Sequence, residues 1–344
     1  MAVPELSEFR PEEASAAEWA AYHSFRRRRQ LDESPDDPLV PDEVVERRLR
    51  RPDPYTFHNL TLAHCEGEVV GEMWASAMTP ASPGYESNRH LMQGGAWVLS
   101  PQRRQGIGRS WLPRLVDLMD RQGATVFTAD TFQEPGHAFL RWLGGEPRFS
   151  EARSRLDLRL LDWNMVRRWV READQRSPGT RLELYVDRLP QERHAEFATA
   201  MTTLLNTMPF EGLDHGELVE TPETLRDWYA REATGSSHHV YMSRESDGSI
   251  SGMTDVLKYD YEPGFVRQQF TGVHPSARGR GLGKWLKAAM LEHVRAVHPD
   301  TVYMTTENAG SNASMLAING ALGFQLYRSA TTYQVQREAL TRRL

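Results

Sequence analysis

Two short turns in the sequence combine arginine and glycine in the same order. The pattern Arg-x-x-Gly-x-Gly occurs at Arg103–Gly108 and again at Arg278–Gly283. Each turn follows a strand-like run and precedes apolar residues at helical spacing. Glycines let backbone N–H groups approach a ligand closely, and the N-terminus of a helix favours an anion. The pattern therefore predicts two turns that can cradle a phosphate group.

Two familiar phosphate-binding loops do not fit the second turn. A nucleoside-triphosphate loop needs glycine where Arg278 stands and Ser or Thr where Trp285 stands. A dinucleotide loop that starts at Gly279 and Gly281 needs a third glycine at Lys284. Another kind of phosphate-bearing ligand is therefore expected.

The two turns belong to a repeat that covers most of the chain. Gly106 corresponds to Gly281 (281 − 106 = 175), and Val98 corresponds to Val273 at the same offset. Each half opens with helix-rich sequence, continues with strand-like runs, and has the turn, an amphipathic helix and a further strand in the same order. We expect one domain at 1–160, a linker at 161–179 and a second domain at 180–344.

The second half carries one more element of interest, Asn312 followed by a short helix that ends at Gly323-Phe324. Together with the two turns, it resembles the GNAT superfamily of acyl-CoA-dependent N-acetyltransferases, in a tandem two-domain form. The resemblance implies an α/β (α+β) fold in which each domain has a mixed, mostly antiparallel sheet flanked by helices. It also implies that two middle strands of each sheet part to admit the pantetheine arm of acetyl-CoA (coenzyme A).

The resemblance assigns acetyl-CoA binding to residues around both turns. In the second copy these are Val273, Arg278, Gly279, Arg280, Gly281, Leu282, Gly283, Lys284 and Asn312. In the first copy they are Val98, Arg103, Arg104, Gln105, Gly106, Ile107 and Gly108. The backbone of Val98 and Val273 would bond the pantetheine, and one N–H could hold the thioester oxygen as it gains charge.

A catalytic role is expected in the second copy. Many relatives have a tyrosine seven residues after the asparagine, to protonate the departing thiolate, but this chain has Asn319 there. An amide can donate a hydrogen bond to sulfur but cannot release a proton at neutral pH. The first copy departs further, with Gln133 for the asparagine and Leu140 for the tyrosine, so we expect it to be partly degenerate, and binding or loss of acyl-CoA there are both open.

The base that accepts the amine proton is not marked by a motif. Glu307 ends a strand expected to face the pantetheine arm, which makes it the first candidate. Asp255 and Glu262, near the ends of neighbouring strands, are alternatives. For each of them, the plain reading is a solvated carboxylate at a strand end. The aromatic, acidic loop at Tyr259–Phe265 is either part of an acceptor site or a plain hairpin turn.

Composition narrows the range of partners. A formal net charge of −6 argues against a nucleic-acid binder, and the run Arg26–Arg29 is expected at a solvated helix end. No apolar run could span a membrane, and the N-terminus has no signal-peptide pattern, so a cytoplasmic monomer or homodimer is expected. Cys65, the one cysteine, excludes a disulfide. Because His238 and His239 are adjacent in a strand, they point to opposite faces, and no metal site is expected.

These features predict an acetyltransferase that moves an acetyl group from acetyl-CoA directly to a primary amine of a small molecule. Transfer through a cysteine is disfavoured because Cys65 lies in the less complete half, in an early strand where packing is its expected role. The alternative is a non-catalytic acyl-CoA sensor or scaffold, consistent with Asn319. A nucleotide-dependent oxidoreductase is a more distant possibility, because hairpin-rich strand pairs precede each turn rather than alternating βαβ units.

Overall fold

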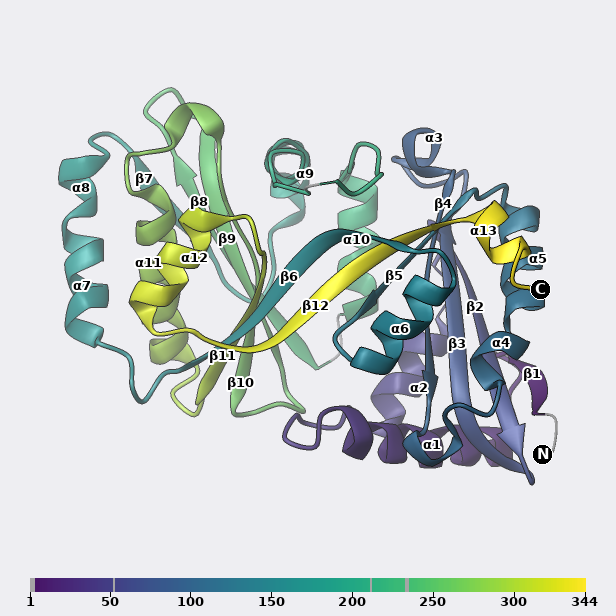
Figure 1. Cartoon of the computed structure of the whole chain (residues 1–344). Coiled ribbons are helices and arrows are strands. Elements are labelled where there is room, and N and C mark those ends of the chain that lie inside the picture. Colours follow the sequence, from purple (N-terminus) through teal and green to yellow (C-terminus); the bar gives the residue numbers. More distant parts are fainter. Residues whose placement is uncertain (1–3, 52, 211, 233–234) are drawn as a thin grey trace. The chain divides into compact units, whose positions relative to one another are not determined.

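A computed structural model describes residues 4–51, 53–210, 212–232 and 235–344. Contacts divide the chain into two compact units, which share a common order of strands and helices (Figure 1). Unit 1 comprises Met1–Arg148, Leu213–Glu217 and Thr331–Leu344, and unit 2 comprises Phe149–Gly212 and Leu218–Ala330.

Unit 1 is built on antiparallel strands that carry helices on their faces. Its elements are β1 (Glu5–Phe9), α1 (Ala16–Glu33), α2 (Asp42–Arg50), β2 (Thr56–Cys65), β3 (Glu68–Met78), α3 (Tyr85–Asn88), β4 (Leu91–Val98), α4 (Ile107–Ser110), α5 (Leu112–Gln122), β5 (Val126–Thr131), α6 (Glu134–Trp142) and α13 (Arg337–Thr341). Strands β1 to β4 pair antiparallel in sequence order, whereas β4 and β5 are parallel. Cys65, at the end of β2, packs partly buried against the core, as expected.

Unit 2 repeats this order. Its elements are β6 (Glu146–Asp157), which begins in unit 1, α7 (Trp163–Arg171), α8 (Ala173–Arg176), β7 (Arg181–Tyr185), α9 (His194–Leu205), α10 (Pro222–Glu232), β8 (Ser236–Arg244), β9 (Ile250–Tyr259), β10 (Phe265–Val273), α11 (Leu282–Val297), β11 (Tyr303–Ala309) and α12 (Ala313–Leu322). Helices α9 and α10 pack on one face of β8 and β9, and α7 and α11 pack on the other.

The last strand of each sequence repeat packs with the unit formed by the other repeat. The end of β12 (Gln325–Gln336) pairs with β5 through Thr331–Gln336, which belong to unit 1. Likewise, β6 pairs with β11 through Glu151–Asp157, which belong to unit 2. The units therefore differ from the ranges 1–160 and 180–344 in this strand. The segment expected to be a linker also differs, because α7 packs on α11 inside unit 2.

The arginine run on α1 does not lie at a helix end. Ser15 and Glu18 form a capping box at the start of α1, and the helix continues past Arg29 to Glu33. Arg26 and Arg27 pair with Asp42, and the next two pair with acidic residues of the same unit: Arg28 with Glu68, and Arg29 with Glu33 and Glu72. The expected solvated helix end was wrong, since carboxylates neutralise each arginine.

Candidate functional site

The turn after β10 has the backbone conformation that its glycines predict. Gly279 and Gly281 have φ values of +80° and +84°, in the left-handed region that favours glycine. Gly281 is the N-cap of α11 and makes no side-chain capping bond. The first N–H groups of α11 therefore remain available to an anion. Arg278 closes the turn, because its Nε donates to the carbonyl of Val273 at 3.2 Å.

Above this turn, β10 separates from its parallel neighbour β11. The two strands pair only from Phe265 to Arg267, although β10 continues to Val273. On its other side β10 stays paired with β9, and the N–H of His274 donates to the carbonyl of Ser251 at 2.8 Å. Because successive backbone groups alternate in direction along a strand, the N–H of Val273 points into the gap between β10 and β11. We call this gap, from Gln268 to Val273, the slot.

A β-bulge lies where the slot begins. The register of β10 against β9 shifts between Gln268 and Phe270, and the N–H of Phe270 donates to Oδ1 of Asp255 at 2.9 Å. Asp255 also contacts His238 at 2.8 Å, and Nδ1 of His238 lies 2.7 Å from the hydroxyl of Tyr229. This buried chain fixes the bulge, so Asp255 has a structural role here rather than that of an exposed base.

The basic residues of the turn have different surroundings. Arg280 turns away from it, with its guanidinium 3.1 Å from Glu245 and 2.6 Å from Thr180. Lys284 lies over the ring of Trp169 at 5.3 Å. The side chain of Leu282 is buried in the core, so only its backbone can contact a ligand.

Arg176 is a residue that the sequence did not mark. It ends α8, in the segment taken for a linker, and its Cδ would lie 3.3 Å from a Cβ placed on Gly281. Arg176 therefore brings a cation to the turn from another helix. The signal in the sequence was weak, because one arginine in a charged segment has no motif.

Two asparagines belong to α12: Asn312 precedes its first residue, and Asn319 lies within the helix. Asn312 is the N-cap, and its Oδ1 accepts from the N–H of Met315 at 3.2 Å. Asn319 is buried, and its Nδ2 donates to Oδ1 of Asn308 at 2.6 Å. Within the described residues, Oδ1 of Asn319 is buried and accepts no hydrogen bond. A buried acceptor left open is costly unless a ligand supplies the donor, so this atom is a candidate contact for the pantetheine arm.

The remaining carboxylate candidates lie in distinct environments. The Glu307 side chain is 56% exposed and forms an ion pair with Arg153 at 3.3 Å. It points to the opposite face of β11 from Asn308, because adjacent strand residues alternate. Glu262 is buried and paired with Arg267. Of the three, Glu307 alone is open to solvent.

The two adjacent histidines point to opposite faces, as expected. His238 contacts Asp255, whereas His239 lies 3.0 Å from His293 and 3.1 Å from His298. Burial, and next the neighbouring charges of His293 and His298, lower the pKa of His239 to about 3. Among the described residues, no group of three or more His, Cys, Asp or Glu side chains is suited to hold a metal ion.

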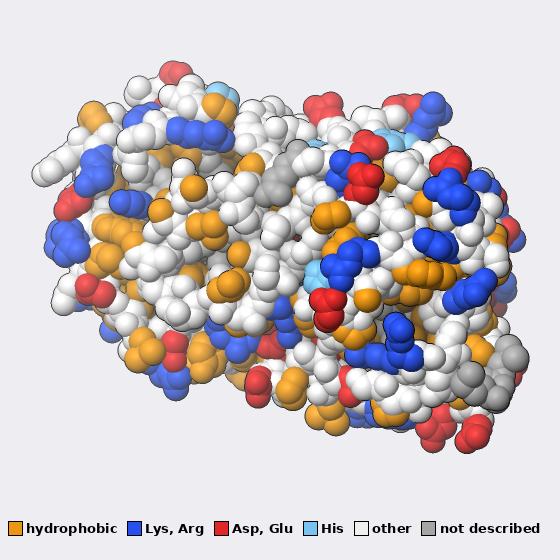
Figure 2. Space-filling model, in the orientation of Figure 1, with side chains coloured by type: hydrophobic (Ala, Val, Ile, Leu, Met, Phe, Trp, Pro, Cys, Tyr) orange, Lys and Arg blue, Asp and Glu red, His pale blue; other side chains and the backbone are white. Residues whose placement is uncertain are grey.

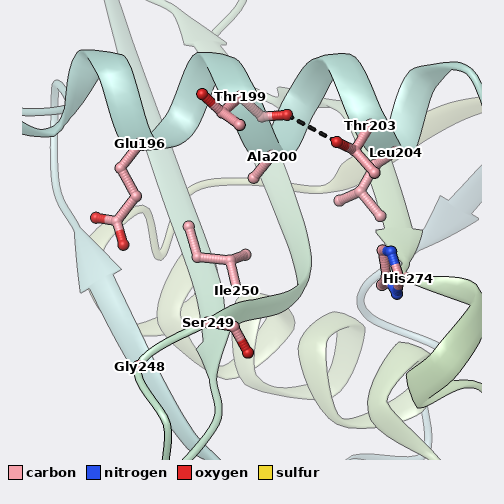
Figure 3. Close-up of a pocket in the computed structure, with 9 residues that line it drawn as sticks. All are labelled: Glu196, Thr199, Ala200, Thr203, Leu204, Gly248, Ser249, Ile250 and His274. Carbon is pink, nitrogen blue, oxygen red and sulfur yellow. Dashed lines mark hydrogen bonds between the residues drawn. The ribbon is translucent and has the colours of Figure 1, made fainter.

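A pocket of about 370 Å³ lies between α9 and the β8–β9 hairpin. Its lining residues are Glu196, Thr199, Ala200, Thr203, Leu204, Gly248, Ser249, Ile250 and His274. Figure 3 shows Glu196 and His274 toward opposite ends of this pocket, and His274 directly follows the last residue of the slot. It is a polar-rimmed site of small-molecule size.

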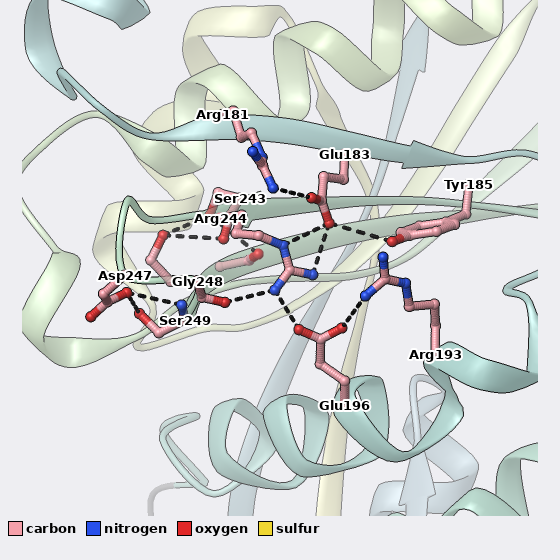
Figure 4. Close-up of polar contacts among 12 residues, drawn as sticks. Arg181, Glu183, Tyr185, Arg193, Glu196, Ser243, Arg244, Asp247, Gly248 and Ser249 are labelled. Carbon is pink, nitrogen blue, oxygen red and sulfur yellow. Dashed lines mark hydrogen bonds and ion pairs between the residues drawn. The ribbon is translucent and has the colours of Figure 1, made fainter.

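Arg244 holds one wall of this pocket in place (Figure 4). Its guanidinium pairs with Glu196 and with Glu183, and it donates to the carbonyl of Gly248 at 2.7 Å. Arg193 reaches Glu196 from its other side at 3.2 Å. The carboxylate of Glu196 is thus already neutralised, which lowers its pKa chiefly through the hydrogen bond from Arg244.

Unit 1 has the same turn, but a bulky side chain stands where its strands β4 and β5 part. Arg104 and Gly106 adopt φ values of +64° and +85°, and Arg103 donates to the carbonyl of Val98 at 2.8 Å. However, the ring of Phe127 would lie 2.7 Å from a Cβ on Gly94, at the point where β4 leaves β5. Among the other expected contacts, Gln105 donates to the carbonyl of Pro101, and Ile107 is buried in the core.

The second half of the chain matches a known family. Residues 199–324 match the acetyltransferase (GNAT) family. They form a GNAT acetyltransferase domain. The sequence matches no curated protein. The fold resembles that of a tandem GNAT protein from the clavulanic acid biosynthesis pathway, with 21% identity, a TM-score of 0.76, and coverage of 97% of this chain and 99% of that chain.

Two further solved structures have a fold similar to that of this chain. One is a GCN5-related N-acetyltransferase from Sphaerobacter thermophilus, at 14% identity and a TM-score of 0.63, with 97% and 96% of the two chains covered. The other is a glucosamine N-acetyltransferase region of a fungal multi-domain GH3 β-N-acetylglucosaminidase, at 11% identity and a TM-score of 0.66; the match covers 97% of this chain and 38% of that one.

The comparisons confirm the expected tandem fold and the enzyme class, acyltransferase. In the described part of the chain, every helix is too short or too polar to cross a bilayer. Figure 2 shows acidic and basic side chains interspersed over the face that it presents.

Proposed function

We propose that the protein is an acetyl-CoA-dependent N-acetyltransferase that transfers the acetyl group directly to a primary amine of a small molecule, with its catalytic centre in unit 2. The observation that carries the proposal is the separation of β10 from β11 above an anion-binding turn. The turn suits a pyrophosphate, and the slot suits the extended arm that leads from it to a thioester.

The proposed binding residues follow from this placement. Backbone groups of Arg278–Lys284 would hold the pyrophosphate, with charge from Arg278, Lys284 and Arg176. The N–H of Val273 and the amide of Asn319 would contact the pantetheine arm, while Asn312 shapes the start of α12. In unit 1, Val98 and Arg103–Gly108 would form an anion-binding turn without an open slot.

Glu307 is the proposed base, because its carboxylate is exposed on the face of β11 away from α12. It would accept the proton that the amine loses as the new C–N bond forms. The acceptor would lie on this face of β11, at the end of the slot away from the turn, because its amine must reach both the thioester and Glu307. The net charge of −6 favours cationic acceptors such as polyamines and amine-bearing antibiotics through long-range attraction.

The test is release of free coenzyme A from acetyl-CoA with a panel of a polyamine, an aminoglycoside and an amino sugar. Amine-dependent release by the wild type, reduced about 100-fold in Glu307→Gln with unchanged acetyl-CoA affinity, is the expected result. Tight binding of acetyl-CoA without release for any amine would favour the acyl-CoA sensor instead.

A further inference from the structure

Lys287 is an unusual residue on α11. It is 2% exposed, although lysine is rarely buried without a charged partner. Its Nζ donates to Oε1 of Gln268 at 2.8 Å and lies 5.2 Å from the centre of the Phe324 ring. Among the residues that the structure describes, Gln268 is its only hydrogen-bond partner. Two of the three donors of the ammonium group are therefore left without a partner.

The location of Lys287 places it at the closed end of the slot. Arg267 is the last residue of β10 that pairs with β11, and Gln268 is the next. From Gln268 to Val273 the strand rises about 16 Å, at about 3.3 Å per residue, and then reaches the turn. A cofactor anchored by its pyrophosphate at the turn must place its far, reacting end near Gln268. The ammonium of Lys287 lies at this end.

Lys287 shares a neighbour, Phe324, with the position that lacks a proton donor. The N–H of Phe324, whose ring Lys287 contacts, donates to the carbonyl of Asn319 at 3.0 Å. Asn319 stands where many relatives have tyrosine, and its amide cannot release a proton. Phe324 thus connects the amine group of Lys287 to the position where the phenol is missing.

The use of lysine in this chain is selective. Of 41 Lys and Arg residues, three are lysines: Lys258, Lys284 and Lys287. Arginine cannot be deprotonated in a protein, whereas the charge of lysine changes readily on burial. Burial lowers the pKa of Lys287 to about 7. That is below the value of about 8.5 for a simple thiol, so proton transfer from the ammonium to a thiolate is downhill.

We propose that Lys287 is the general acid of unit 2, whose ammonium group protonates the sulfur of coenzyme A as the C–S bond breaks. The inference rests on the proposed function. As the amine nitrogen forms its bond to the acyl carbon, the electron pair of the C–S bond goes to sulfur, and Lys287 supplies the proton that makes the free thiol. Lys287 is left neutral and regains a proton from the one that the acceptor amine releases to the base.

Other charged or titratable groups against α11 lie at different levels of the helix. Arg176 and Lys284 lie at its first turn. His239 on β8 contacts His293, about 9 Å further along, and Lys258 on β9 donates to the carbonyls of Tyr259 and Glu262. The shift of Lys287 is caused by burial alone.

The test compares Lys287→Met and Lys287→Arg with Lys258→Met, which removes the other buried lysine. For the fastest amine of the panel, Lys287→Met should lower kcat about 100-fold or more, with little change in acetyl-CoA affinity and no loss of thermal stability. Lys287→Arg should restore part of kcat by hydrogen bonding to sulfur. The wild-type kcat should fall as pH rises through about 7, and this decline should be absent from both Lys287 variants and present in Lys258→Met.

Several results would overturn the proposal. One is a kcat of Lys287→Met within about threefold of the wild type, and another is the same decline with pH in the wild type and Lys287→Arg. If Lys287→Met does not fold, the wild-type profile still decides: a kcat that does not decline between about pH 6 and 9 contradicts the role. A wild type that binds acetyl-CoA but acetylates no amine defeats the proposed function instead.

Discussion

Unit 1 and unit 2 share one turn and differ in the slot above it. Both turns use a left-handed glycine at the helix N-cap and an arginine that closes back on a strand carbonyl. The side chains where the two strands part are different. In unit 1 the Phe127 ring packs against Gly94 of β4, whereas in unit 2 Gln268 of β10 accepts a hydrogen bond from Lys287. Backbone features that bind an anion are thus present twice, whereas those suited to a thioester occur in unit 2.

Strand β10 of unit 2 has one residue more than strand β4 of unit 1 between its paired end and the turn. Val266 of β10 and Met92 of β4 are the middle residues of the short segments that pair with β11 and β5, and their numbers differ by 174 (266 − 92 = 174). At the other end of the same strands, Val273 and Val98 differ by 175. The extra residue is the β-bulge of β10, and β4 pairs with β3 without a shift of register. A bulge redirects the strand that follows it. Unit 1 lacks this bulge, and the missing residue and the position of Phe127 against β4 therefore go together.

The most disruptive substitution should be Phe127→Ala in unit 1. Phe127 is buried in the core of that unit, so the cavity should lower the free energy of unfolding by about 3–5 kcal/mol, as measured by chemical denaturation. Acetyl-CoA stoichiometry should not rise, because Leu112 and Leu140 still stand where unit 2 has Lys287 and Asn319. A second binding site in this variant would show that Phe127 alone separates the two units.

Filling the space between the first turn of α11 and Val273 should disable the cofactor site of unit 2. Gly283 lies 3.4 Å or more from Ile318 and Val273, measured from a Cβ placed on it, and its counterpart Gly108 faces Phe139. Gly283→Leu should weaken acetyl-CoA binding about 100-fold, because the branched side chain competes with the cofactor for this space. Calorimetry measures the change, and an unchanged thermal transition serves as its control. Unchanged affinity would place the cofactor elsewhere.

Acid should destabilise unit 2 more than unit 1. The pKa of His239 is about 3 in the folded chain and about 6.5 when unfolded. Between these values the unfolded chain binds the extra proton, so stability is complete above pH 6.5 and falls as pH falls. At pH 5 the loss from His239 is about 2 kcal/mol, with further loss from the lowered pKa values of His293 and His298. Thermal unfolding should show one transition moving more than the other, and less so in His239→Phe.

The smallest expected effect is a difference in acetyl-CoA affinity between the alanine variants of two arginines near the turn. Arg176→Ala should weaken acetyl-CoA binding about fivefold and flatten its salt dependence, because one exposed cation near phosphate contributes about 1 kcal/mol. Arg280→Ala should change affinity less, since Arg280 points away from the turn to Glu245, a more buried carboxylate than Glu172, the partner of Arg176. The reverse order would mean that Arg280 leaves Glu245 when the cofactor binds.

Much of this fold follows from local sequence. The strands and helices around both turns were predicted because alternation, helical spacing and glycine at the caps are local signals, and β10 and α11 lie on either side of the second turn as expected. The exchange of β6 and β12 was not predicted, because either strand carries the same local pattern whichever unit it joins.

The site was predicted only in part. The turns have a motif, but Arg176 comes from a segment without one. Lys287 was missed because a lysine next to apolar Leu286 is expected to face solvent at the edge of an amphipathic helix. Helix α11 is instead buried on nearly all sides. Conversely, Val297, the last residue of α11, is apolar and yet 42% exposed. Burial depth depends on what packs around a helix, which spacing does not show.

The most direct measurement is a calorimetric titration of acetyl-CoA into the wild-type chain, read for stoichiometry. We predict one acetyl-CoA site per chain, and we expect Gly283→Leu to lose it. Two equivalent sites would contradict the contrast between the units, and no binding by the folded wild type would contradict the assignment of the slot.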